Sequence, residues 1–278
     1  MKNKINLIVL GLLSTTAMFY ACQKEVSGNV FTTDLNKPHS VRIYLTDDQT
    51  PVFDSVFIDL QQLQVKLEDD ALPNGGWVNV DIRSGVYNIL RFRNGLDTLF
   101  ATGTLPNAKV KKIRLVLGTR NSVMKDGQSF PLKLHNDDRE VVVNLAGNNF
   151  EIIAPGQVLF WIDFDASRSI QIDNSGSGNH NGFRLKSHIR IFAKSHSGSI
   201  EGRVLPAEAD ARVMAINGTD TTIAIPEDDD GEFKIVGLNA GTYTVFVDGQ
   251  NNYRDTTIAG VMVRNNEDTH IPTITLKR

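Results

Sequence analysis

Alternating apolar and polar residues, in short runs separated by clusters of Gly, Asn and Asp, occupy this chain from residue 41 to its end. A period of two places apolar side chains on one face of a β-strand, and Gly, Asn and Asp favour the turns between strands. Because no long amphipathic helix appears, only short helical turns are expected, at 85–92 and after Asp165. An all-β chain built from sandwiches is therefore predicted.

Eight strands are predicted before residue 195, and one of them changes phase. They cover 41–46, 53–69, 77–82, 97–105, 109–117, 139–145, 158–165 and 182–194. In 53–69 the apolar positions shift by one residue between Leu60 and Leu63. One extra residue there predicts a β-bulge near Gln61 and Gln62.

A second unit is predicted from residue 197 to 278, as a smaller seven-stranded sandwich of immunoglobulin or prealbumin type. Its strands are expected at 198–206, 211–217, 221–226, 231–237, 241–249, 254–263 and 270–277. The Asp230-Gly231 pair is predicted as a hairpin turn rather than part of a calcium loop.

The segment EDDDGEFKIVGLNAGTYTVFV (227–247) resembles the carboxypeptidase regulatory-like, transthyretin-type domains. The match rests on Phe233, Leu238, Gly241, Thr242 and Tyr243. This resemblance covers 197–278 and implies a non-catalytic β-sandwich module.

The N-terminus predicts an address outside the cytoplasm. Lys2 and Lys4 precede an apolar run, and Cys22, the only cysteine, follows Ala21. This arrangement resembles the lipobox of bacterial lipoproteins, so 1–21 is predicted as a signal peptide and 22–40 as a lipidated tether. Acylation of Cys22 would anchor the chain to the outer membrane of a Gram-negative bacterium, facing the periplasm or the cell surface, with the membrane as its partner.

The larger unit, residues 41–196, resembles a known family. The segments VRIYLTDDQTPVFDSVFIDLQQLQV, LRFRNGLDTLFATGTLP, KIRLVLG and WIDFDASRSI occur in the order found in an uncharacterised bacterial lipoprotein family, the domain-of-unknown-function family 4382. The resemblance implies an architecture and a surface location, and it implies no chemistry.

Three aspartates form a candidate metal site. Asp163 and Asp165 are two residues apart, so on a strand their carboxylates point the same way, and Asp47 ends another predicted strand. Together they would offer the hard oxygen ligands that Ca²⁺ prefers, which makes Ca²⁺ the one cofactor considered. The alternative is that these carboxylates close strand ends and that Asp165 caps a helical turn.

Composition narrows the classes of function. The chain carries 29 Lys and Arg against 32 Asp and Glu, a net charge of −3, so nucleic acid is not an expected partner. Hydrolase signatures are absent, and Trp77 and Trp161 are predicted to be core residues.

The sequence predicts a non-catalytic lipoprotein that binds a glycan or another surface polymer. The alternative is an adhesion or assembly protein that works by β-strand addition at the exposed sheet edges that sandwiches offer. A hydrolase that uses Asp163 or Asp165 is the least favoured hypothesis.

Overall fold

The structure is a computed structural model that describes residues 38–68, 70–106, 108–145, 151–153, 157–173 and 182–278. The predicted signal peptide, Cys22 and the tether up to residue 37 lie outside the described residues. Among the described residues, no helix is long and apolar enough to cross a membrane.

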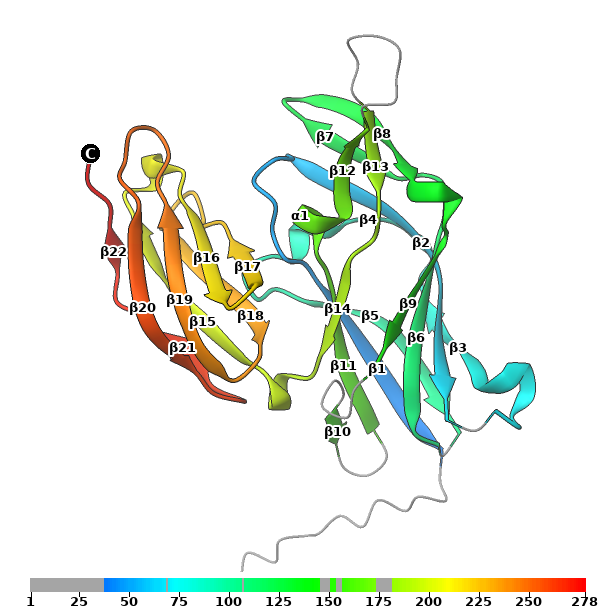
Figure 1. The fold of residues 1–278 in the computed structure, drawn as a ribbon. Helices are drawn as coiled ribbons and strands as arrows, with labels where there is room; N and C mark the ends of the chain where they lie inside the picture. The colour runs from blue at the N-terminus through cyan, green and yellow to red at the C-terminus, as the bar shows by residue number, and fades with distance from the viewer. Residues whose placement is uncertain (1–37, 69, 107, 146–150, 154–156, 174–181) are drawn as a thin grey trace, which may run out of the picture. The chain divides into compact units, whose positions relative to one another are not determined.

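The all-β prediction is confirmed (Figure 1). The strands of the larger sandwich are β1 (His39–Thr46), β2 (Ser55–Leu67), β3 (Trp77–Ile82), β4 (Gly85–Asn88), β5 (Thr98–Leu105), β6 (Val110–Leu117), β7 (Ser122–Lys125), β8 (Gln128–Leu134), β9 (Glu140–Asn144), β10 (Glu151–Ile153), β11 (Gln157–Phe164), β12 (Ile170–Asp173), β13 (Gly182–Leu185) and β14 (Ile189–Phe192). The described helical segments are η1 (Pro73–Gly76), η2 (Ile89–Phe92), η3 (His135–Asp137), α1 (Ala166–Ser169), η4 (Lys194–His196) and η5 (Ala207–Ala209).

The strands of the larger sandwich hydrogen-bond in one path, β10-β11-β1-β5-β3-β2-β7-β8-β13-β12, with β4, β6, β9 and β14 attached to its members. They enclose one apolar core, in which Ile43, Leu63 and Phe160 are fully buried. The predicted β-bulge is confirmed, because the pairing of β2 with β6 shifts between Leu60 and Gln62.

Several parts of the larger sandwich differ from the prediction. The helical turn expected at 85–92 is confined to η2, with β4 before it, and strands β10 and β12 were not expected. The expected strand 182–194 is two strands, β13 and β14, separated by residues 186–188. Strands β7 and β8 were not expected, although the Asp126-Gly127 pair between them has the positive φ angles, 50° and 72°, of a tight hairpin turn.

The C-terminal sandwich has two four-stranded sheets. Its strands are β15 (Gly198–Leu205), β16 (Arg212–Asn217), β17 (Asp220–Ala224), β18 (Glu232–Leu238), β19 (Gly241–Asp248), β20 (Thr256–Val263), β21 (Asp268–His270) and β22 (Ile274–Thr275). One sheet has the order β17-β16-β19-β20, and in the other β15 pairs with β18, β21 and β22. The expected last strand, 270–277, is thus two short strands on either side of Pro272.

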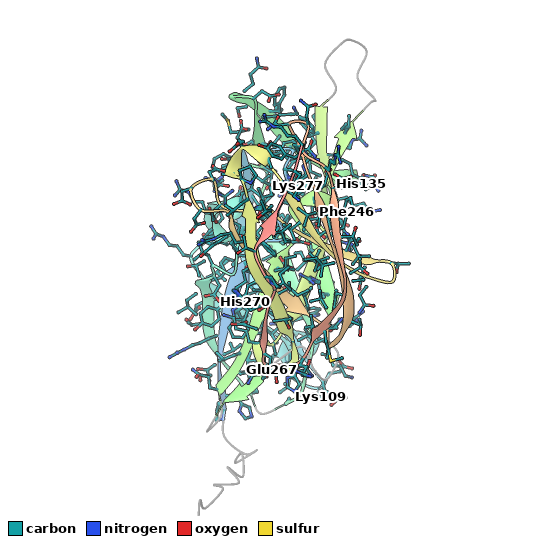
Figure 2. All side chains as sticks on the ribbon, turned by 90° about the vertical axis from the view of Figure 1, so that its left-hand side faces the viewer. Lys109, His135, Phe246, Glu267, His270 and Lys277 are labelled. Atoms are coloured by element: carbon teal, nitrogen blue, oxygen red, sulfur yellow. The ribbon has the colours of Figure 1, made fainter. Side chains whose placement is uncertain are left out.

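A separate apolar core lies between these two sheets. Fully buried Ile200, Val213 and Val245 belong to it, and Phe233 and Tyr243 are also buried there. Figure 2 shows the side chains of this part of the chain, with Phe246 on β19 and His270 on β21 labelled.

The Asp230-Gly231 turn is not a hairpin, which corrects the prediction. The strands on either side of it, β17 and β18, belong to different sheets, so the turn carries the chain from one sheet to the other. Gly231 has a φ of +77°, and a Cβ atom there would lie 2.1 Å from the carbonyl oxygen of Val204. Glycine is therefore required by both the backbone angle and the space.

The two sandwiches meet along a seam, the contact surface between residues 39–193 and 198–276. A third apolar cluster lies there, formed by Leu159, Trp161 and Phe192 with Tyr44 and Val236 packed against it. Because Val236 is on β18 and the others are in the larger sandwich, this cluster joins the two units.

Candidate functional site

The register of three strands brings the predicted aspartates together at the seam. Strand β1 runs parallel to β11, with Thr46 opposite Asp163, so the C-terminal ends of both strands lie at the same edge of the sheet. Asp47 and Asp48 follow β1 directly, and Asp165 follows β11. Strand β14 is antiparallel to β11 and places Arg190 opposite Asp163.

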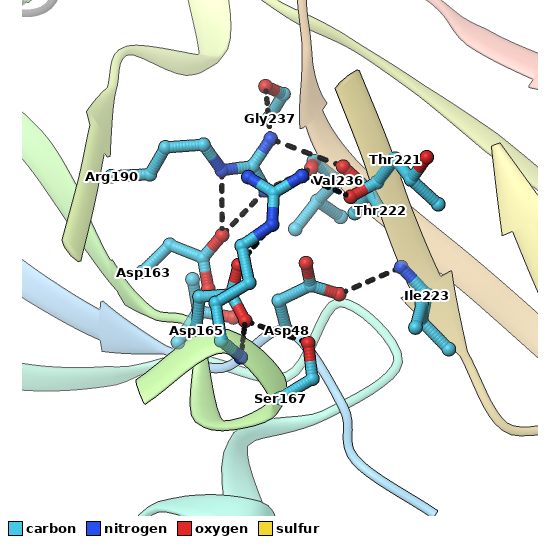
Figure 3. Close-up of polar contacts among 12 residues, drawn as sticks. Asp48, Asp163, Asp165, Ser167, Arg190, Thr221, Thr222, Ile223, Val236 and Gly237 are labelled. Carbon is cyan, nitrogen blue, oxygen red and sulfur yellow. Dashed lines mark hydrogen bonds and ion pairs between the residues drawn. The ribbon is translucent and has the colours of Figure 1, made fainter. Parts of the chain in front are cut away.

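Asp163 forms an ion pair with Arg190 (Figure 3). Its Oδ2 atom accepts hydrogen bonds from Nη2 at 2.5 Å and from Nε at 3.0 Å. Asp163 is 1% exposed, while the Arg190 side chain is 34% exposed. The guanidinium group also donates to Thr222 Oγ1 at 3.4 Å, so one side chain links the buried carboxylate to the C-terminal sandwich.

Asp165 caps helix α1, as the alternative interpretation predicted. Its Oδ1 atom accepts from the main-chain N–H of Arg168 at 2.8 Å and from Ser167 Oγ at 2.9 Å. The side chain of Arg168 also lies 3.5 Å from Oδ2. The carboxylate therefore supplies acceptors to the first turn of a short helix, where main-chain N–H groups lack partners within the helix.

Asp47 is buried, and neither of its carboxylate oxygens has a hydrogen-bond partner in the described part of the chain. Burial raises the pKa of Asp47 well above its ordinary value, and the nearby charge of Asp163 raises it further. The main-chain amide of Ala166 lowers this pKa, but it does not reach hydrogen-bonding geometry with either oxygen.

Asp48 is also buried but has a partner across the seam. Its Oδ1 atom accepts from the main-chain N–H of Ile223 at 2.9 Å. Burial raises the pKa of Asp48 well above its ordinary value, Asp163 adds to this effect, and Arg190 opposes it. Four carboxyl groups thus share a region in which Arg190 and Arg168 supply the positive charges.

The structure brings the three predicted ligands to one end of the sheet, yet Asp163 and Asp165 already have protein partners. Among the described residues, no three His, Cys, Asp or Glu side chains are arranged to hold a metal ion. Binding of Ca²⁺ by Asp47, Asp163 and Asp165 therefore stays a prediction.

A pocket of about 320 Å³ lies beside this cluster at the seam. Its lining includes Asp48, Asp165, Arg168, His188, Arg190 and Asn239. Hydrogen-bond donors and acceptors from both sandwiches therefore face one space, whose volume is at the small end of the range of about 300–1,000 Å³ found for ligand pockets.

Sequence reasoning missed Arg190 and Asp48 as site residues. Arg190 interrupts the apolar run of Ile189, Ile191 and Phe192, and a lone charge in such a run is a signal for a buried ion pair. Asp48 gave no such signal, because its partner on β17 is 175 residues away.

The two tryptophans differ in environment. Trp161 is 7% exposed, stacks on Tyr44 at 5.1 Å between ring centroids, and donates from Nε1 to Asp97 at 2.8 Å, so its prediction as a core residue is confirmed. Trp77 is only half-buried, and the guanidinium group of Arg114 lies 4.3 Å from its ring centroid. That ring packs under a cation on the sheet surface and not in the core.

A family model described as "Domain of unknown function (DUF4382)" matches residues 39–187. No curated protein matches the chain. Among solved structures, the Bacillus anthracis TIE protein is similar at 12% identity and a TM-score of 0.24, over 86% of this chain and 40% of that chain, so this chain spans less than half of that protein.

Two pilins are also similar. The shaft pilin SpaA from Lactobacillus rhamnosus GG matches at 11% identity and a TM-score of 0.20, over 87% of this chain and 99% of that chain. The minor pilin GBS52 of Streptococcus agalactiae matches at 11% identity and a TM-score of 0.21, over 86% of this chain and 96% of that chain. Identities and TM-scores this low transfer no function to this chain.

Proposed function

The chain belongs to the family of the domain of unknown function DUF4382 over residues 39–187, and on that premise we propose that it is a non-catalytic, lipid-anchored surface module that binds a glycan or a similar polymer. The observation that carries the proposal is the seam pocket of about 320 Å³, the pocket beside the aspartate cluster. Sugar hydroxyl groups both donate and accept hydrogen bonds, and carboxylate, guanidinium and amide groups from two sandwiches face this space.

The roles of Asp163 and Asp165 favour binding over hydrolysis. A carboxyl group that acts as a general acid, base or nucleophile must reach the substrate. Asp163 is 1% exposed and paired with Arg190, and Asp165 caps α1. The hydrolase hypothesis would require turnover that disappears in Asp163→Ala while the fold is retained.

A glycan array followed by affinity electrophoresis tests the binding proposal. His188 and Asn239 line the pocket, and their side chains form none of the hydrogen bonds described across the seam, so His188→Ala and Asn239→Ala should each weaken glycan retention by about tenfold without unfolding the protein. The matched control is His270→Ala, because its side chain is 75% exposed on β21 and lies in a different groove, of about 630 Å³.

Two results would contradict this assignment. If the protein bound no glycan on a broad array, the glycan-binding proposal would be wrong. Retention that falls in His270→Ala but not in the two pocket variants would move the site to the groove on the β15, β18 and β21 sheet.

The lipid anchor is a separate part of the proposal. Cys22 is the only cysteine, so metabolic labelling with palmitate should mark the wild-type chain and should not mark Cys22→Ala. Label that persists in Cys22→Ala would defeat the proposed anchor.

A second candidate function is assembly by strand addition at β12. This strand ends the hydrogen-bonded path of the larger sandwich, and Ile172 on it is 63% exposed. Oligomers that grow with concentration and disappear in Ile172→Lys would support it. Leu96→Lys is the control, because Leu96 is 60% exposed but lies outside any strand, and an equal effect of both variants would argue against β12.

A further inference from the structure

The outer edge of β17 is covered by side chains from the larger sandwich. In an edge strand, every second residue turns its N–H and C=O groups away from the sheet. Here these residues are Thr221 and Ile223, and Ile225, directly after the strand, continues the same alternation. Four contacts meet them: Arg168 Nη2 donates to Thr221 O at 3.1 Å, Asp48 Oδ1 accepts from Ile223 N at 2.9 Å, Gln49 Oε1 accepts from Ile225 N, and Asn94 Nδ2 donates to Ile225 O at 3.2 Å.

The neighbouring edge, β18 in the other sheet, is covered in the same way. Asn94 Oδ1 accepts from Lys234 N at 3.4 Å. Arg190 donates to the carbonyl oxygens of Gly237 at 3.4 Å and Val236 at 3.5 Å. Asn94 therefore contacts β18 of one sheet and the residue that directly follows β17 of the other.

Two of the covering side chains are themselves buried. Asp48 is 6% exposed and Gln49 is 2% exposed, although both are polar. A strand edge that lacked such partners would leave main-chain donors and acceptors free to pair with another chain. The side chains satisfy four of these groups without adding a strand, and the sheet stops at β17.

The other edges of the same sandwich are protected by their own backbone. Strand β20 contains one extra residue where its pairing with β19 shifts, and Gly260 there has a φ of +76°. Bulges of this kind bend an edge away from regular pairing. Strands β21 and β22 are short and are separated at Pro272, which has no N–H group. Strand β17 instead depends on residues far away in the sequence.

We propose that the edge of β17 is a strand-accepting surface that Asp48, Gln49 and Asn94 hold closed, and that the partner it fits is β17 of a second copy of this chain. The sequence DTTIA (220–224) suits antiparallel pairing with itself. With Thr222 opposite its copy, Asp220 faces Ala224 and Thr221 faces Ile223. Like charges do not meet, and Thr–Thr pairs across strands are favourable.

The inference does not depend on glycan binding. The edge becomes available when the seam opens, because the covering side chains belong to the larger sandwich. The short segment Lys194–His196 joins the units, so opening needs rotation about a few residues.

Hydrogen exchange and sedimentation of the full chain test the proposal. In the wild type, the amides of Ile223 and Ile225 should exchange slowly although they lie at a sheet edge, and the chain should stay monomeric. The triple variant Asp48→Ala, Gln49→Ala, Asn94→Ala should exchange these amides about fivefold faster or more, because each amide loses its hydrogen-bond acceptor, and should dimerise as concentration rises.

Matched variants separate the covering contacts from general destabilisation. Asp48→Asn with Gln49→Glu retains a carbonyl or carboxylate oxygen at each position and should behave like the wild type. If the triple variant does not fold, Gln49→Ala alone should show faster exchange at Ile225, and Asn94→Ala alone should show faster exchange at Lys234. Adding Ile223→Pro to the triple variant should abolish the dimer, since proline removes an outward N–H.

Three results would overturn the proposal. The first is rapid exchange of Ile223 and Ile225 in the wild type. The second is a triple variant that stays monomeric at high concentration with these amides exposed. The third is a dimer that persists with Ile223→Pro, which would place the contact elsewhere.

Discussion

Asp47 is buried beside three other aspartates and has no hydrogen-bond partner among the described residues. Its pKa is raised from the ordinary value of 3.8, so the folded chain holds its proton more tightly than the unfolded chain. The stability that this group contributes is fully present at acidic pH and is lost as the pH rises through its folded pKa.

Asp47→Asn should therefore stabilise the protein, because it keeps the shape of the side chain and removes the charge. We expect the free energy of unfolding to rise by about 1 kcal/mol or more above neutral pH and to change little at acidic pH. Urea titrations across this pH range measure it, with exposed Asp81→Asn as control. An Asp47→Asn variant that is less stable at high pH would contradict the assigned direction.

The Asp163 and Arg190 pair should contribute to stability through its buried partner. Removing the guanidinium in Arg190→Met leaves a carboxylate that is 1% exposed. An exposed ion pair contributes roughly 1 kcal/mol to the free energy of unfolding, and breaking a fully buried one costs about 3–5 kcal/mol. Because Arg190 is partly exposed, we expect Arg190→Met to lower the free energy of unfolding by an amount between these values.

A double-mutant cycle with Asp163→Asn measures this coupling. The double variant should be more stable than the sum of the two single losses predicts. Additive losses would mean that the ion pair contributes nothing of its own.

At the level of single residues, the sequence predicted roles that depend on neighbours in the chain. Asp165 was foreseen as a cap because its partners, Ser167 and Arg168, are two and three positions away. The partner of Asp48 could not be foreseen, because no local pattern indicates which amide 175 residues away meets a carboxylate. The ion pair of Asp163 depends on the register of β14, which sequence periodicity does not set.

Among the strands, long alternating runs were predicted well and short ones were missed. Strand β3 has the predicted limits, and the bulge in β2 followed from one phase shift. Strands β4, β7 and β12 have four residues each, which gives only two periods of alternation. The turn at Gly231 was assigned to a hairpin because local residues determine a turn but not the sheet that the next strand joins.

Gly231→Ala should destabilise the C-terminal sandwich more than Gly218→Ala. Both glycines have positive φ angles, +77° and +62°, so both substitutions cost about 1 kcal/mol in backbone strain. Only at Gly231 does the new Cβ atom meet an atom, the carbonyl oxygen of Val204 at 2.1 Å, while nothing lies within 4 Å at Gly218. Thermal melts compare the two variants, and equal losses would show that the clash is relieved by movement.

On the scale of the whole molecule, the seam should make the two sandwiches unfold together. The side chains that cover β17 and β18 and the apolar cluster around Phe192 couple the units. Calorimetry of residues 38–278 should therefore give one transition. Phe192→Ala removes the ring that packs at the seam and should split this transition in two.

Phe100→Ala is the control for this experiment. Phe100 is 5% exposed and Phe192 is 6% exposed, but Phe100 lies inside the larger core. Phe100→Ala should lower the free energy of unfolding of the larger sandwich by about 3–5 kcal/mol without involving the seam cluster. Two transitions in the wild type would show that the seam does not couple the units.

Trp161 gives the chain a built-in optical probe. Its indole lies between Tyr44 and Phe192 in the cluster that Val236 of the other sandwich completes, with the ammonium group of Lys194 4.8 Å from the ring centroid. Trp77 is on β3, which β1 and β5 separate from β11 in the sheet order, and its ring packs against Arg114 of β6. In a Trp77→Phe background, the emission wavelength of the remaining indole would report separation of the sandwiches without an added dye or label.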